Sequence, residues 1–171
     1  MILGMSVATF TLVHVIISLI GIATGLIVLY TMLANRISAL TSTFLATTVL
    51  TSATGFLFQS NAIGPPHIVG ALSLLILVFT LLAFYKFQLA GRWRAVYVVT
   101  GVLALYLNVF VGVVQAFQKI PALNRFAPLG NEPPFAIAQG LVFALFVALG
   151  WLALKRFHPS TARPQRIAQT A

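Results

Sequence analysis

The chain has 171 residues, of which 60% are hydrophobic and 6% are charged, and its mean hydropathy is +1.05. A soluble domain of this size could not bury so much apolar surface in one core, so the composition indicates a membrane protein. Cysteine is absent, which excludes disulfides, thiolate nucleophiles, iron–sulfur clusters and cysteine-ligated zinc.

Apolar stretches of about 20 residues, separated by short polar breaks, follow one another along the chain. A helix rises 1.5 Å per residue and the hydrocarbon core of a bilayer is about 30 Å thick, so each stretch is long enough to cross once. The sequence therefore predicts an all-α, polytopic bundle of five transmembrane helices within residues 1–154, followed by a basic cytoplasmic tail at 155–171. We place the helices at about 12–33, 38–58, 67–90, 95–117 and 135–154.

The polar breaks define these limits in chain order. Asn35-Arg36 follows the first helix, and Gln59-Ser60-Asn61 follows the second. Gly64-Pro65-Pro66 precedes the third, because proline lacks an N–H and fits the first turn of a helix. The basic turn Gly91-Arg92-Trp93-Arg94 precedes the fourth, and a proline-rich loop at 119–134 precedes the fifth. No basic segment comes before the long first helix, so we interpret it as a retained anchor rather than a cleaved signal peptide.

The cations predict the orientation. The net charge of +9 would suggest nucleic-acid binding in a soluble protein, but here the basic residues alternate with the helices. Lys119, Arg125 and the only carboxylate side chain, Glu132, fall on one side. The remaining cations fall on the other side: Arg36, Lys86, Arg92, Arg94, Lys155, Arg156, Arg163 and Arg166. The positive-inside rule then places the N-terminus outside and the tail in the cytoplasm, with anionic lipid headgroups as partners and no nucleic acid.

Small residues at four-residue spacing predict the packing faces, because close backbone approach drives helix association in lipid. The stripes comprise Gly21 and Gly25 in the first helix, Thr47, Thr51 and Gly55 in the second, and Gly140 and Ala144 in the fifth. They could pack within one chain, in a homo-oligomer, or against a membrane partner. The hydroxyls of the second helix could instead line a water path, as in a passive channel, or bond back to their own helix.

Two histidines, His14 and His67, fall near the predicted outer face on different helices. This is the arrangement that a bis-histidine b-type haem requires, and such a haem could exchange electrons with a quinone. Each imidazole could instead satisfy a helix end or a loop carbonyl. Two imidazoles fall short of the four ligands usual for zinc, so no metal site is predicted.

Amides supply the other candidate ligand-binding groups, namely Asn61, Asn108, Gln115 and Gln139. The chain contains no Asp and a single Glu, so paired carboxylates, a Ser–His–Asp triad and acid-based proton relays are disfavoured. We therefore expect a non-enzymatic membrane protein that binds a small apolar or lipid-like ligand, or a membrane partner, through polar groups at its outer face. The haem-redox and channel functions are the alternatives.

The first helix carries His14, Gly21 and Gly25 and is followed by Arg36, and the second ends in Thr51-Ser52-Ala53-Thr54-Gly55-Phe56. In these features the chain resembles the front half of small uncharacterised bacterial inner-membrane proteins. The resemblance covers about residues 1–85 and implies a bacterial plasma membrane, with no activity attached.

Overall fold

The computed structural model describes residues 2, 4–58 and 64–159. This part of the chain is helical and contains no named β-strand, which confirms the all-α prediction. Its elements are α1 (Val7–Leu33), α2 (Thr41–Gly55), α3 (Pro65–Leu81), the π-helical turn η1 (Leu82–Lys86), α4 (Trp93–Lys119), α5 (Pro121–Asn124) and α6 (Pro133–Arg156).

Four helices of the described chain are long and apolar enough to cross a membrane: Val7–Leu33, Pro66–Lys86, Trp93–Lys119 and Pro133–Arg156. α2 is not one of them. Its 15 residues give a helix of roughly 22 Å, which is shorter than a hydrocarbon core of about 30 Å. The prediction of membrane helices therefore stands for these four.

Several helix ends differ from the predicted limits for local reasons. α1 begins at Val7 rather than near residue 12, because the Ser6 hydroxyl accepts a hydrogen bond from the Thr9 amide at 3.1 Å and caps the helix. It ends as predicted, where Asn35 adopts a left-handed conformation with φ 57°. The predicted second helix, 38–58, is helical only over Thr41–Gly55.

The third helix ends at Lys86 rather than near residue 90. Gln88 and Leu89 have φ angles of 49° and 61°, which no helix can continue through. At the other end of the chain, the last helix is longer than predicted and spans Pro133–Arg156. The short helix α5 lies in a loop for which no helix was predicted.

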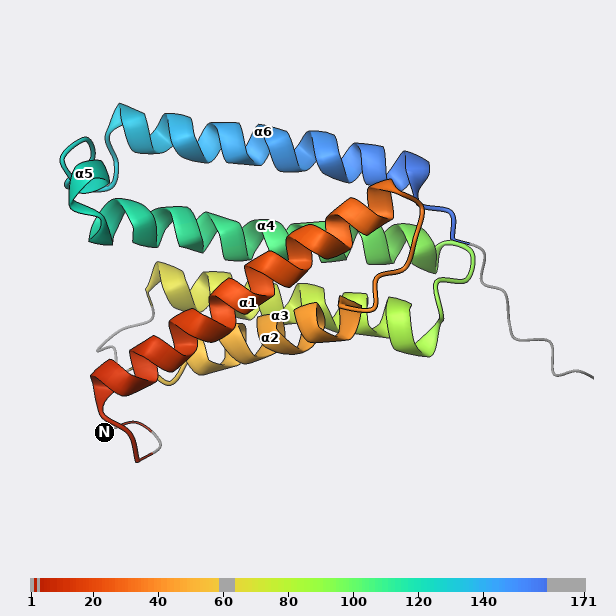
Figure 1. Cartoon of the computed structure of the whole chain (residues 1–171), viewed down its shortest axis with the longest axis horizontal. Coiled ribbons are helices and arrows are strands. Elements are labelled where there is room, and N and C mark those ends of the chain that lie inside the picture. Colours follow the sequence, from red (N-terminus) through yellow and green to blue (C-terminus); the bar gives the residue numbers. More distant parts are fainter. Residues whose placement is uncertain (1, 3, 59–63, 160–171) are drawn as a thin grey trace, which may run out of the picture.

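The helices form one elongated bundle in which α4 has a central place (Figure 1). α4 packs against α3, α6 and α1, while α2 packs against both α1 and α3. α1 crosses the bundle obliquely, lying along α2 and also reaching α6. Within the described residues, α1 and α3 have no direct backbone approach. The core lies between these helices and includes Met32, Phe44, Leu45, Leu77, Tyr97 and Leu105.

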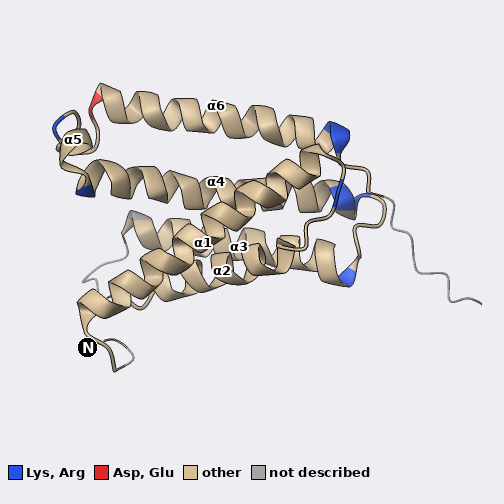
Figure 2. Ribbon diagram, viewed as in Figure 1, with Lys and Arg blue, Asp and Glu red and all other residues tan. Residues whose placement is uncertain are grey.

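Cations gather at one end of the bundle (Figure 2). We call this the basic end; its described members are Arg36, Lys86, Arg92, Arg94, Lys155 and Arg156. The opposite end carries Lys119, Arg125 and Glu132. Successive long helices therefore run between two ends of unequal charge, as the sequence pattern requires.

Gly21 and Gly25 pack α1 against α2 and α4. A Cβ atom at Gly25 would lie 2.5 Å from Leu105 Cδ1 and 2.8 Å from Phe44 Cε2. A Cβ atom at Gly21 would lie 3.2 Å from Thr47 Oγ1. Because these two glycines have no side chain, α1 approaches α2 and α4 closely. The stripe formed by Gly21 and Gly25 therefore packs within one chain.

The other small residues have different surroundings. Thr47 donates to the Thr43 carbonyl of its own helix at 2.7 Å, whereas the Thr51 hydroxyl is buried without a hydrogen-bond partner in the described structure. Gly55 faces the His14 ring across α1 and α2. On α6, Gly140 and Ala144 are exposed, so packing of that stripe against another chain stays a prediction.

Candidate functional site

His14 lies half-buried on α1 and is held by α2. Its Nδ1 atom is 2.8 Å from the Thr54 hydroxyl, which in turn lies 2.6 Å from the Leu50 carbonyl oxygen. Because the carbonyl can only accept, the Thr54 hydrogen points to Leu50, and the Thr54 oxygen accepts from Nδ1–H of His14. The assigned tautomer therefore leaves a lone pair on Nε2 of His14, which has no hydrogen-bond partner among the described residues.

His67 caps the amino end of α3. Its Nδ1 atom accepts a hydrogen bond from the Gly64 amide at 3.3 Å, which satisfies one of the amides before the first turn. A neutral ring that accepts at Nδ1 carries its hydrogen at Nε2. His67 thus presents an N–H where His14 presents a lone pair.

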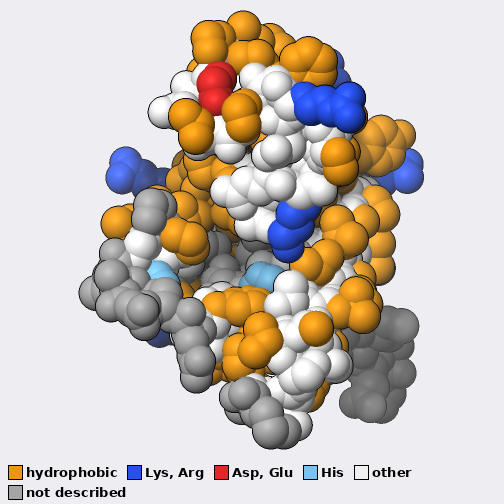
Figure 3. Space-filling model, turned by 90° about the vertical axis from the view of Figure 1, so that its left-hand side faces the viewer, with side chains coloured by type: hydrophobic (Ala, Val, Ile, Leu, Met, Phe, Trp, Pro, Cys, Tyr) orange, Lys and Arg blue, Asp and Glu red, His pale blue; other side chains and the backbone are white. Residues whose placement is uncertain are grey.

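His14 lies in the first half of α1 and His67 in the first turn of α3, so both lie toward the opposite end, where Figure 3 shows histidine side chains in a recess of the surface. Different aromatic rings adjoin them: Phe58 is 5.1 Å from His14, and Phe56 is 5.8 Å from His67, between ring centroids. Bis-histidine ligation needs a lone pair from each ring, and this arrangement provides one. No group of three metal-ligating side chains occurs among the described residues.

The predicted amides do not form one site. Asn108 is buried on α4 and donates from Nδ2 to the Thr48 hydroxyl at 3.2 Å, so it joins α4 to α2. Gln139 on α6 donates to the Phe110 carbonyl at 3.1 Å, and its Oε1 is buried without a partner in the described structure. Gln115 is exposed on α4. Asn61 lies outside the described residues.

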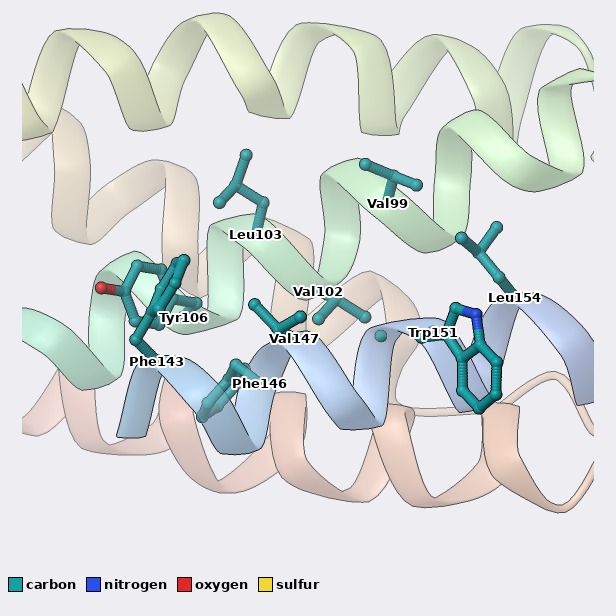
Figure 4. Close-up of a pocket in the computed structure, with 10 residues that line it drawn as sticks. Val99, Val102, Leu103, Tyr106, Phe143, Phe146, Val147, Trp151 and Leu154 are labelled. Atoms are coloured by element: carbon teal, nitrogen blue, oxygen red, sulfur yellow. The ribbon is translucent and has the colours of Figure 1, made fainter. Parts of the chain in front are cut away.

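A groove of about 300 Å³ lies between α4 and α6, where no site was predicted (Figure 4). Its volume is at the lower limit of small-molecule sites, which occupy about 300–1,000 Å³. α4 contributes Val99, Val102, Leu103 and Tyr106, and α6 contributes Phe143, Phe146, Val147, Gly150, Trp151 and Leu154.

The groove opens to the side of the bundle. Val99 and Trp151 are 48% and 56% exposed, whereas Val102 at the base is only 7% exposed. Gly150 allows the close approach of α6, because a Cβ there would lie 3.3 Å from Val102 Cγ1. The lining is apolar apart from the Tyr106 hydroxyl and the Trp151 N–H, so the groove suits a hydrocarbon chain.

Cations border one end of this groove. Trp151 and Leu154 lie at that end, and Tyr106 and Phe143 lie at the other (Figure 4). Lys155 Nζ is 3.7 Å from the centroid of the Trp151 ring, a cation–π contact. Arg94 donates from Nη1 to the Leu154 carbonyl at 3.1 Å, which brings a second cation to the same place.

Sequence reasoning missed the groove for a physical reason. On a membrane helix, an apolar residue that faces lipid and one that lines a groove look alike, because both contact hydrocarbon. The available signal was the pairing of Gly150 with large residues one turn away on either side, Phe146 and Leu154. Such a gap becomes a groove only when the neighbouring helix, here α4, is known.

No family model, no curated protein and no solved structure matches the chain.

Proposed function

We propose that the chain is an integral protein of the bacterial inner membrane, with five crossings, an outer N-terminus and a cytoplasmic tail, and that it binds a lipid-like ligand in the α4–α6 groove. It acts as a binding protein rather than an enzyme. The four long apolar helices support the membrane location, and the cations at the basic end support the orientation.

α2 supplies the fifth crossing in this proposal. α1 ends at the basic end, and α3 begins at the opposite end (Figure 1). α2 connects the two and packs against both, so it traverses the bundle with them. The apolar residues Leu57 and Phe58 continue beyond its last turn and lengthen the crossing. Neighbouring helices cover its buried polar side chains, among them Thr41, Thr48 and Ser52, which makes a short helix tolerable in the bilayer.

The groove is the observation that carries the binding function. It is concave, apolar and open toward the hydrocarbon, so a lipid-like molecule can enter from the bilayer without crossing water. The ligand site proposed from the sequence, at the outer polar groups, has less support, because Asn108 and Gln139 already bond to other helices. The groove therefore replaces it.

The haem and channel functions have no comparable support. His67 accepts a hydrogen bond at Nδ1, which leaves the wrong tautomer for ligation through Nε2. The hydroxyls of Thr47 and Thr54 bond to carbonyls of their own helix, as hydroxyls that do not line a pore commonly do. A visible absorption spectrum of protein from haem-replete cells remains the direct test of the haem prediction.

Trp151 provides a built-in reporter for the proposed binding. Replacing Trp93 by Phe leaves Trp151 as the only tryptophan and retains a ring to stack on Phe87, whose centroid is 3.8 Å away. The protein is purified in lipid-free detergent micelles, and phosphatidylcholine with brominated acyl chains is then titrated in. Bromine quenches indole fluorescence on contact. We expect Trp151 to be quenched in a saturable way at a low ratio of brominated lipid to detergent.

Two matched variants decide the result. Val147→Phe narrows the groove and should remove the saturable part of the quenching. In a second protein, both natural tryptophans are replaced by Phe, and Leu145→Trp places an indole on a part of α6 that is 54% exposed and does not line the groove. Its quenching should follow the bulk lipid composition. If Trp151 and this control indole respond alike, and Val147→Phe changes nothing, groove binding is rejected.

A further inference from the structure

The α4–α6 groove and the cations at its mouth form one continuous feature. From Leu154 to Phe143, α6 rises roughly 16 Å at 1.5 Å per residue. One leaflet supplies about half of a 30 Å hydrocarbon core. The groove therefore extends from the basic end to about the bilayer midplane, and its length matches a single acyl chain of that leaflet.

The cations at its mouth have no carboxylate side chain nearby. The sequence contains one acidic residue, Glu132, and it lies at the opposite end of the bundle. Lys155 is exposed, and its ammonium group rests on the ring of Trp151, which lines the groove. A cation–π contact leaves the ammonium hydrogens free to donate. Arg94 adds positive charge beside Leu154.

We propose that the occupant of the groove is an anionic phospholipid of the basic-end leaflet, with one acyl chain between α4 and α6 and its phosphate at Lys155. This inference rests on the proposed lipid-binding function and adds the charge and leaflet of the ligand. Charge complementarity carries it: the apolar surface selects a hydrocarbon chain, and the Lys155 ammonium at the end of that surface, which has no ion pair among the described residues, selects a negative headgroup.

The site differs from general attraction between a basic surface and an anionic leaflet. General attraction depends on the total charge, so any exposed cation near the surface contributes about equally. The affinity of a defined binding site depends on the cation that adjoins the groove. Arg156 provides the comparison, because it is the next residue of α6, is exposed, and carries the same charge as Lys155.

The test uses the full-length Trp93→Phe protein in the same lipid-free detergent micelles, with an uncharged detergent. Quenching of Trp151 is measured with brominated phosphatidylglycerol and, separately, with brominated phosphatidylcholine at equal mole fractions. We expect phosphatidylglycerol to bind about fivefold more tightly, the ratio that corresponds to the interaction of one lysine with an anionic lipid surface. Lys155→Gln should bring this ratio to about 1, and Arg156→Gln should leave it near the parent value.

The outcomes separate the two proposals. Equal saturable quenching by both lipids would retain a lipid site in the groove and reject its anionic selectivity. Equal losses in Lys155→Gln and Arg156→Gln would assign the preference to diffuse surface charge and reject the site at Lys155. Quenching that only follows the bulk lipid composition would reject groove binding itself. Circular dichroism of each variant confirms that the helices are intact.

Discussion

Among the described glycines, a Cβ atom would meet its neighbours most closely at Gly25. Leu105 and Phe44, which a Cβ there would meet at 2.5 Å and 2.8 Å, are 1% and 2% exposed, so other side chains enclose them. Gly25→Ala should therefore overpack the junction of α1, α2 and α4 and lower the free energy of unfolding by about 1–3 kcal/mol. Thermal unfolding in detergent micelles measures the change.

Gly140 offers the matched control for this substitution. A Cβ there meets nothing within 4 Å, so Gly140→Ala should gain about 0.5–1 kcal/mol from the lower backbone entropy of the unfolded chain. Equal stability of the two variants would show that α1 does not approach α2 and α4 as closely as described.

Asn108 and Thr48 form a buried polar contact between α4 and α2, with 3.2 Å between Nδ2 and Oγ1. Hydrogen bonds between membrane helices contribute about 0.6 kcal/mol on average. Asn108→Ala and Thr48→Val should each lower stability, and the double variant should lose less than the sum of the two. A double-mutant cycle from reversible unfolding measures this coupling; strict additivity would contradict the contact.

The residue types at these positions were readable from the sequence, but their partners were not. Gly21 and Gly25 were predicted to allow close packing, and the structure gives the facing helices. The two histidines were predicted to lie toward the same end because helix lengths set their depth. Their hydrogen bonds, to Thr54 and to Gly64, depend on side-chain directions that spacing does not determine.

Glu132 holds the loop that precedes α6. Its carboxylate accepts hydrogen bonds from the amides of Leu129 at 2.9 Å and Asn131 at 3.0 Å, and these bonds, that from Leu129 foremost, lower its pKa below the usual value. A carboxyl with a lowered pKa stabilises the folded state above its unfolded pKa. This contribution is lost as pH falls through the lowered value.

Glu132→Gln should therefore reduce the Tm at neutral pH, and the difference from the parent protein should vanish in strong acid, where both side chains are uncharged. Glu132 is the only acidic side chain, and both proteins keep the C-terminal carboxyl, so the difference in Tm between them from pH 6 down to pH 2 reports Glu132 alone. A difference that stays constant over this range would show that the carboxylate does not hold the loop.

The positions of the helices could be predicted from the lengths of the apolar stretches, whereas the residues at which the helices end depend on local backbone geometry. The apolar run after Leu81 predicted a helix to about residue 90, yet the π-helical turn and the left-handed residues Gln88 and Leu89 end it earlier. Such a turn leaves no signal in the hydropathy of the sequence. α2 shows the same limit, because turns on both sides of it confine the helix itself to Thr41–Gly55.

For the whole molecule, charge alternation predicted which helix ends lie together, and the bundle brings Lys86, Arg94 and Lys155 to one end. The groove could not be predicted, because it needs the packing of α6 on α4 and the hollow beside Gly150. Such a groove arises from the arrangement of two helices rather than from the composition of either helix.

The accessibility of single introduced cysteines reports the number and direction of the membrane crossings. The sequence has no cysteine, so Ala39→Cys, Ala90→Cys and Asn131→Cys each introduce a single thiol at an exposed position. With a membrane-impermeant maleimide on intact cells, we expect Asn131→Cys to react and the other two to react only after permeabilisation. Labelling of Ala39→Cys and Ala90→Cys from different sides would show that α2 does not cross, and labelling of Ala90→Cys and Asn131→Cys from the same side would contradict the topology.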